Sequence, residues 1–430
     1  MNCKMLNRTK NLSNCWKKRI FLLCWFAYAI AYLGRLNFSI AIPRIEESLP
    51  FDKTSLGLIG SVYFWVYAFG QLINGRLGDK FSCRNFVFAG LFFSAIFNIL
   101  FAFSTNPYVM IILWAFNGYS QSMLWGPLMK TINQWFPDRE KSKIAIQMSA
   151  TYLSGFLLAW GGLGQLLSYT DWPGIFWIPG IVLFTYSIIW YAFARDNPGE
   201  AGLDYNDVKT SYQDGSEVME KKAEIKTEIK EKKEFSFLKL ISSPGLYLVA
   251  LAGIPLGFIR EGIVLWSPTM LYETFRLDLQ SITGAALLIP LFNFIGVIIA
   301  RLLISRFQNK ETSLVLLYFT SGTLACIFLY LLGSRGIITN LTLLALCSSS
   351  FYGATSIITS VIPLKYSATS SIAGFLDFSI YLGAGLSGIA AGFLSSRVGW
   401  SIVAVTWILA GAIGSLCLFM EGKTRNKRLI

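Results

Sequence analysis

Long apolar runs separated by short polar breaks extend along most of this 430-residue chain. An α-helix needs about 20 apolar residues to cross the hydrocarbon core of a bilayer. Runs of that length predict twelve membrane-spanning helices, over residues 20–42, 54–77, 84–104, 108–130, 143–168, 173–194, 244–271, 281–305, 312–333, 339–363, 369–395 and 400–420. The pattern therefore predicts an all-α membrane protein, with six helices before one long polar stretch and six after it.

That polar stretch, residues 195–243, divides the chain. Its segment 220–234 is charged with both signs and has few apolar anchors, which is typical of a solvated linker. We therefore expect an N-terminal six-helix bundle over 1–194, a cytoplasmic central linker over 195–243 and a C-terminal six-helix bundle over 244–430. The two bundles look like pseudo-symmetric repeats, because the first predicted helix of each carries an arginine and the second ends in a basic cluster.

The composition excludes an ordinary soluble protein. Hydrophobic residues make up 54% of the chain and charged residues only 14%, against about 25% charged residues in soluble domains. The net charge of +13 would suggest a nucleic-acid partner in a soluble protein. Here, however, most Lys and Arg fall on one side of the membrane if the predicted helices alternate in direction. We therefore expect a multi-pass protein of the cell membrane, embedded in the lipid bilayer, with both termini cytoplasmic and no nucleic-acid partner.

The residues of enzyme active sites are missing. The chain has no histidine, and its seven cysteines show no metal-binding spacing. No nucleophile–base pair or phosphate-binding glycine loop occurs, so we expect no enzyme, no cofactor, no metal and a monomer. Residues 1–19 are polar and basic, and the apolar run that follows is too long for a cleavable signal peptide. The first predicted helix is thus expected to serve as its own insertion signal.

Two arginines lie inside apolar runs. Arg35 falls within 20–42 and Arg260 within 244–271. A charge at the centre of a membrane helix costs about 2.5–3.5 kcal/mol on insertion scales, so such residues usually face a cavity or a partner. Guanidinium groups bind carboxylate and phosphate with two parallel hydrogen bonds. We predict that both arginines bind a small anionic substrate; the alternative is a structural role, in which each pairs with helix carbonyls or an acid.

Polar side chains form stripes on several predicted helices. Tyr28, Tyr32, Arg35 and Ser39 recur at the spacing of one helical face. A polar face on a membrane helix is expected to look toward protein or water, although hydrogen bonding between helices explains the same pattern. Similar stripes are formed by Tyr63, Tyr67, Gln71 and Asn74, by Asn117 and Gln121, and by Ser348, Tyr352, Thr355 and Thr359.

Two acidic residues also fall within predicted membrane helices. Glu261 follows Arg260 directly, and Asp377 lies in the run 369–395. Neighbouring side chains on a helix are about 100° apart, so Glu261 and Arg260 need not pair. We expect each acid to balance the charge of an arginine; proton coupling is the alternative.

The segment Asn74–Arg84 carries a short motif, with Gly75, Gly78, Asp79 and Arg84 in a Gly-x-Leu-x-Asp pattern followed by basic residues. It resembles the signature loop of the major facilitator superfamily. The resemblance implies a cytoplasmic gating motif in which Asp79 sits near a helix N-terminus and helps to hold one conformation.

A narrower resemblance covers the whole chain. Tyr28–Pro43 is similar to the first helix of the organophosphate:phosphate antiporters, a group that includes the bacterial glycerol-3-phosphate and hexose-phosphate transporters. The resemblance implies the major facilitator fold, and binding of phosphate by Arg35 and Arg260 with Tyr28 and Tyr32 beside them. Further similar segments are Asn117–Pro127, Arg195–Leu203, Arg260–Glu273 and Gly374–Asp377 with Tyr381–Gly383.

The chain departs from the bacterial members at two positions. Those members place a histidine close to where Thr151 stands and a lysine where Gln71 stands, and both groups are linked in the family to binding of the phosphate or its organic part. A site with neutral groups there is less positive, so a monoanion or carboxylate is also a candidate substrate. We expect substrate-binding side chains at Arg35, Arg260, Tyr28, Tyr32, Gln71, Gln121, Thr151, Tyr352 and Tyr381.

The sequence therefore favours a secondary transporter of a small organic anion. We expect an organophosphate, such as a sugar phosphate or glycerol phosphate, moved by rocker-switch alternating access with phosphate as a candidate exchange partner. Two alternatives stay open: a proton-coupled symporter of an organic carboxylate, and a transporter-like membrane sensor of a phosphorylated sugar.

Overall fold

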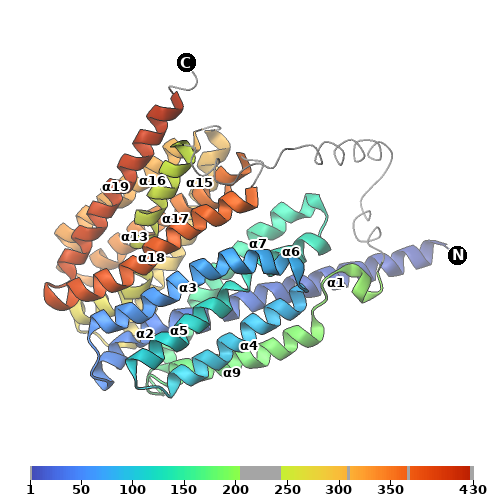
Figure 1. Cartoon of the computed structure of the whole chain (residues 1–430), viewed down its shortest axis with the longest axis horizontal. Coiled ribbons are helices and arrows are strands. Elements are labelled where there is room, and N and C mark those ends of the chain that lie inside the picture. The colour runs from blue at the N-terminus through green and yellow to red at the C-terminus, as the bar shows by residue number, and fades with distance from the viewer. Residues whose placement is uncertain (1, 204–243, 308–309, 366–368, 427–430) are drawn as a thin grey trace.

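A computed structural model describes residues 2–203, 244–307, 310–365 and 369–426 (Figure 1). Helices account for almost all of this part of the chain, and no strand occurs in the described residues. The helices before residue 204 are α1 (Asn2–Ala31), α2 (Leu33–Ser48), α3 (Lys53–Lys80), α4 (Cys83–Ala102), α5 (Pro107–Ser122), α6 (Trp125–Trp135), α7 (Asp138–Phe156), the π-helical η1 (Leu157–Leu163), α8 (Gly164–Leu166), α9 (Gly174–Phe193) and the short η2 (Pro198–Ala201).

The helices after residue 243 form the second group. They are α13 (Pro244–Phe275), α14 (Leu279–Ala286), α15 (Leu288–Arg306), α16 (Glu311–Leu332), η3 (Gly333–Arg335), α17 (Ile337–Ser360), η4 (Ile362–Lys365), α18 (Thr369–Arg397) and α19 (Trp400–Asn426). Most of the predicted linker, residues 204–243, lies outside the described residues.

Several helices begin where the sequence supplies a capping side chain. The carboxylate of Asp52 accepts hydrogen bonds from the hydroxyl and the backbone N–H of Ser55 at the start of α3, and these bonds, the hydroxyl's first, hold the pKa of Asp52 below its ordinary value. Asn106 caps α5 in the same way, with Pro107 in the first turn, where its missing N–H costs nothing. These caps set the turns between the predicted membrane runs.

Some predicted helices are interrupted. The run 108–130 is divided into α5 and α6, and the run 281–305 into α14 and α15. Each break lies three or four residues before a proline, Pro127 or Pro290, which cannot donate the backbone hydrogen bond that would continue the helix. The run 20–42 is divided at Tyr32, where the Arg35 amide bonds to the carbonyl of Tyr32.

Within the described residues, ten helices are long and apolar enough to cross a membrane. They match ten of the predicted runs and confirm an all-α, multi-pass membrane protein. The runs 108–130 and 143–168 are the two that do not qualify; the first is split between α5 and α6, and α7 starts with charged residues. The count of twelve spanning helices stays a prediction.

The two groups of helices meet chiefly along α3 and α18, and also where α2 contacts α13 (Figure 1). Near the start of α3 the backbones of the two helices touch, because a Cβ atom on Gly57 would collide with the carbonyl oxygen of Gly388 on α18. We call the face at which α9 ends and α13 begins the linker face, and the other the opposite face. The tightest contact between the groups therefore lies toward the opposite face.

Candidate functional site

A cavity of about 390 Å³ lies between the two groups of helices and is lined by both. It extends from the level of Arg35 and Arg260 toward the linker face, where the last residues of α17 line it. A ligand-sized space of this kind, bounded by aromatic rings with a few polar groups, is typical of a small-molecule site. Its polar and aromatic lining includes Tyr28, Tyr32, Arg35, Tyr67, Gln71, Trp125, Tyr152, Arg260, Glu261, Asn293, Tyr352, Thr355, Ser356, Thr359, Asp377 and Tyr381.

Arg35 enters the cavity because the first predicted helix is broken beside it. With the Arg35 amide bonded to Tyr32, the carbonyl of Ala31 lacks its helical partner, and the side-chain amide of Gln121 donates to it at 3.1 Å. Asn117 donates to the carbonyl of Gly34 at 2.8 Å. The stripe formed by Asn117 and Gln121 therefore supports the backbone around Arg35 and does not line the cavity.

The guanidinium of Arg35 is surrounded by tyrosines. It donates to the hydroxyl of Tyr381 at 3.2 Å, and its central carbon lies 5.1 Å from the ring centre of Tyr67. The rings of Tyr32 and Tyr63 are also within cation–π range. Arg35 forms no ion pair with a described carboxylate. Its charge is therefore available to a ligand.

Arg260 has a different environment. It is only 5% exposed, pairs with the carboxylate of Glu261 at 2.7 Å and donates to the hydroxyl of Thr355 at 3.3 Å. Arg260 and Glu261 thus form an ion pair although they point about 100° apart around the helix, because the long arginine side chain reaches across that angle. The Nε atom of Arg260 has no partner among the described residues.

Tyr381 contacts both arginines. Its ring centre lies 5.7 Å from the guanidinium carbon of Arg35 and 5.6 Å from that of Arg260. The two cations, one from each group of helices, therefore approach a common point in the cavity. Tyr352 adds a second ring beside Arg260, at 5.3 Å.

Two further polar residues that line the cavity are Asp377 and Asn293. Asp377 forms no ion pair with any described residue. Asn293 is 4% exposed, and neither its amide nitrogen nor its oxygen has a hydrogen-bond partner in the described part of the chain. Buried polar groups are rarely left unsatisfied. A ligand in the cavity would supply what Asn293 and the Nε atom of Arg260 lack.

The structure brings together most of the predicted site residues. Gln121 and Thr151 do not line the cavity: Gln121 supports the first helix, and the Thr151 hydroxyl bonds to the carbonyl of Met148. The neighbour of Thr151, Tyr152, lines the cavity instead. Lining residues that the predicted set missed include Tyr67, Trp125, Tyr152, Asn293, Thr355, Ser356 and Thr359; the polar stripes had marked Tyr67, Thr355 and Thr359. The predicted site residues that do line the cavity are Arg35, Arg260, Tyr28, Tyr32, Gln71, Tyr352 and Tyr381, with the acids Glu261 and Asp377.

The gating motif is not the loop that the sequence suggested. Helix α3 continues to Lys80, so Gly75, Gly78 and Asp79 belong to its last turns, and the side chain of Asp79 lies outside the described residues. The Gly78 carbonyl accepts a hydrogen bond from Lys130. Arg84 lies on α4 and donates to the carbonyl of Tyr191 at 2.6 Å, which ties α4 to α9 within one group.

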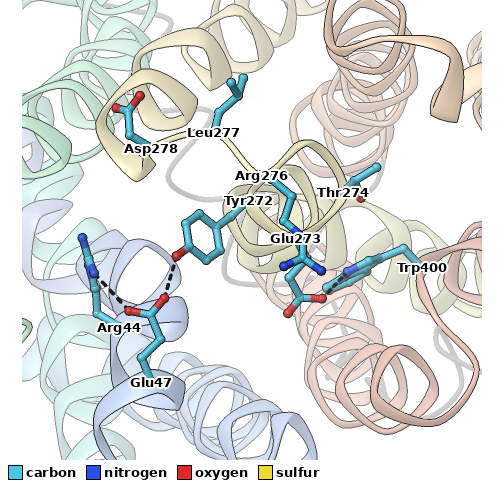
Figure 2. Close-up of a pocket in the computed structure, with 9 residues that line it drawn as sticks. All are labelled: Arg44, Glu47, Tyr272, Glu273, Thr274, Arg276, Leu277, Asp278 and Trp400. Atoms are coloured by element: carbon cyan, nitrogen blue, oxygen red, sulfur yellow. Dashed lines mark hydrogen bonds and ion pairs between the residues drawn. The ribbon is translucent and has the colours of Figure 1, made fainter.

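On the opposite face, polar contacts lie in and beside a surface pocket of about 650 Å³, and two of them join the two groups (Figure 2). Lys53 on α3 pairs with Glu273 on α13 at 2.6 Å. Tyr272 donates to Glu47 at 2.6 Å, and the Trp400 indole donates to Glu273 at 2.8 Å. We call these five residues the opposite-face latch: Lys53–Glu273 and Glu47–Tyr272 join the two groups, and the Trp400 bond holds Glu273 within the second group.

Three curated relatives are similar to the chain over nearly its whole length. A probable hexose phosphate transport protein of Chlamydia trachomatis is 26% identical, with 94% of this chain and 90% of that protein covered. The glycerol-3-phosphate transporter of Bacillus subtilis is 28% identical, with coverage of 89% and 87%. The membrane sensor protein UhpC of Escherichia coli is 24% identical, with coverage of 95% and 93%. These relatives confirm the resemblance to the organophosphate:phosphate antiporters.

The fold is also shared with solved transporters. The crystal structure of a bacterial homologue of the human lysosomal transporter Spinster superposes with a TM-score of 0.71 at 12% identity, over 96% of this chain and 98% of that one. Residues 24–387 match the Major Facilitator Superfamily. With the helical architecture and a cavity between two groups of helices, this match shows that the chain belongs to the major facilitator superfamily.

Proposed function

We propose that this protein is a secondary transporter of a small organophosphate, such as a sugar phosphate or glycerol phosphate, with inorganic phosphate as its exchange partner. Its relatives from Chlamydia trachomatis and Bacillus subtilis, named as transporters of hexose phosphate and glycerol 3-phosphate, support this substrate class. Those relatives and the superfamily are transporters, and no enzymatic step is needed to explain the site.

One observation carries the proposal: a guanidinium from each group of helices reaches the same cavity. Arg35 and Arg260 both lie within 6 Å of the Tyr381 ring centre, at 5.7 and 5.6 Å, so a phosphate bound there would contact both groups. Arginine binds phosphate through two parallel hydrogen bonds. A ligand that joins the groups favours the closed arrangement and so couples binding to the movement of the helices.

The same proposal assigns the topology. The linker face is the cytoplasmic face of the cell membrane, both termini are cytoplasmic, and the described structure is the inward-open state of a monomer with no nucleic-acid partner. The six-helix bundles extend over 1–194 and 244–430, with 195–243 between them. The excess of Lys and Arg expected on that face supports this orientation, as does the latch that joins the two groups on the opposite face.

Exchange in proteoliposomes tests the function. Vesicles preloaded with phosphate are expected to take up labelled glucose 6-phosphate or glycerol 3-phosphate, and unloaded vesicles are not. Arg35→Gln is expected to abolish uptake, whereas Arg397→Gln, an exposed arginine at the end of α18, serves as the matched control. Uptake that Arg35→Gln leaves unchanged would refute the proposed site.

The sensor remains a second candidate because the Escherichia coli relative is named as one. A sensor is expected to be stabilised against heat by a phosphorylated sugar, since the ligand binds only the native state, and yet to show no uptake. A proton-coupled carboxylate symporter is expected to respond to a pH gradient with a carboxylate and to ignore phosphorylated compounds.

A further inference from the structure

The charges that line the cavity balance. Two described cations, Arg35 and Arg260, face two described anions, Glu261 and Asp377. Glu261 is already paired with Arg260. The cavity therefore also holds one guanidinium, that of Arg35, and one carboxylate, that of Asp377, which form no ion pair with a described residue. A ligand with only negative charges would pair with the Arg35 guanidinium but be repelled by the Asp377 carboxylate, because like charges in a partly desolvated space repel strongly.

Asp377 is placed to meet the far end of a bound phosphomonoester. It precedes Tyr381 by four residues on α18, so both side chains share one helical face. Four residues of α-helix span about 6 Å along the axis, so the backbone of Asp377 lies about that far from the backbone of Tyr381, toward the linker face. Gly374, one turn further on, has no atom within 4 Å of the position that a Cβ would take. The carboxylate therefore has open space beside it.

Aromatic rings on the first group of helices also line this part of the cavity. The ring of Tyr28 lies 4.7 Å from that of Trp125 and 5.8 Å from that of Tyr152. Tyr152 is 37% exposed, so its ring is open to the cavity. The faces of aromatic rings attract cations, and no described Lys or Arg lies over these three rings.

We propose that the substrate is a zwitterionic organophosphate, a phosphomonoester that also carries a protonated amine about 6 Å from its phosphate. Arg35 and Arg260 bind the phosphate, Asp377 pairs with the ammonium group, and the rings of Tyr28, Trp125 and Tyr152 bound the space around it. Asp377 is thus the residue that determines specificity. This inference rests on the proposed organophosphate transport and names the substrate class within it.

A competition assay with three sugar phosphates tests the inference. Glucosamine 6-phosphate carries the ammonium group, glucose 6-phosphate has a hydroxyl in its place, and N-acetylglucosamine 6-phosphate has a neutral amide. Each competes with labelled glucose 6-phosphate for uptake into proteoliposomes. We expect glucosamine 6-phosphate to compete about tenfold better than the other two, the effect of one charge pair of about 1.4 kcal/mol.

Variants then assign the preference to one carboxylate. Asp377→Asn is expected to remove the preference for the amine while glucose 6-phosphate is still transported, and Asp377→Glu to keep part of it. Asp171→Asn, a change in an exposed loop on the opposite face, is the matched control. If Asp377→Asn does not fold, Asp377→Ser and the comparison of ligands on the unmodified protein still decide.

The outcomes separate this inference from the proposed function. If none of the three compounds competes and glycerol 3-phosphate is not taken up either, organophosphate transport itself fails. If all three compete equally, transport stands and the zwitterionic substrate is refuted. A preference that survives in Asp377→Asn would also overturn the assignment. Asp377 that serves as a proton carrier would give equal competition and a loss of pH-gradient-driven uptake for every substrate in Asp377→Asn.

Discussion

The two arginines of the cavity occupy equivalent places in the two groups of helices, yet their surroundings differ. Arg35 is half-buried among tyrosine rings and has no described carboxylate partner, whereas Arg260 is nearly fully buried and paired with Glu261. The difference teaches that two arginines at equivalent positions need not contribute equally to the binding of an anion. Arg35 supplies net attraction for an anion, while Arg260 supplies a neutralised group held in a fixed orientation.

The largest effect is expected at Arg35. In the proposed site, replacing it with lysine removes one of the two parallel charge-assisted hydrogen bonds to phosphate, which contributes roughly 1.5–3 kcal/mol, so uptake of glucose 6-phosphate is expected to fall about 100-fold. The measurement is initial uptake rate in proteoliposomes, with Arg397→Lys as the control. If Arg35→Lys loses no more uptake than Arg260→Lys, the proposed difference between the two arginines is wrong.

Arg260→Lys is expected to lose about tenfold, because Glu261 already offsets the charge and only the geometry of the fork is lost. The same assay applies. Retention of the unmodified rate would show that the second group of helices does not contact the phosphate.

Glu261→Gln tests the asymmetry from the other side. Removal of one partner of a buried ion pair typically costs 3–5 kcal/mol, so the ligand-free variant is expected to melt at a lower temperature. The freed Arg260 is then expected to bind phosphate more tightly, and saturating glucose 6-phosphate should raise the melting temperature more than in the unmodified protein. An equal rise in both proteins would argue against a role for Arg260 in binding.

Asn293→Leu gives a smaller effect. The change removes a buried amide without a partner, so the ligand-free protein is expected to gain about 1–2 kcal/mol of stability. Affinity for the phosphorylated ligand is expected to fall several-fold, since the amide would pair with it. Thermal unfolding with and without glucose 6-phosphate measures both, and loss of stability without ligand would contradict the assignment.

The smallest effect is expected from the positions at which the chain departs from its bacterial relatives. Gln71→Lys adds a cation to the cavity and is expected to raise affinity for phosphate a few-fold. Thr151→His is expected to add nothing to it, because Thr151 is fully buried outside the cavity. A gain from Thr151→His alone, measured by competition with inorganic phosphate, would show that the cavity extends further than described.

Much of this arrangement follows from the sequence because a bilayer penalises charge and unpaired backbone groups so strongly. The apolar runs predicted the helices, and the two intramembrane arginines with Tyr28 and Tyr32 predicted one wall of the cavity. Polar stripes were less informative, because side chains that face a ligand and side chains that bond to another helix recur at the same helical spacing. Gln121 is the second kind, and only the break at Tyr32 reveals it.

Other features depend on packing that no single segment encodes. Tyr152 lines the cavity and Thr151 does not because of the way α7 is rotated against α1. The pairing of Glu261 with Arg260 depends on side-chain conformations that helical spacing does not fix. The break at Tyr32 has no proline to announce it, unlike those near Pro127 and Pro290.

The backbone contact between α3 and α18 has a mechanical consequence. Where Gly57 meets Gly388 and Gly392 meets the carbonyl of Lys53, the two helices approach backbone to backbone, with the small side chain of Ser61 packed against Gly388. One helix can then tilt over the other without lifting knobs out of holes, as small residues at membrane helix crossings allow. We expect this crossing to be the pivot about which one group of helices tilts on the other during transport.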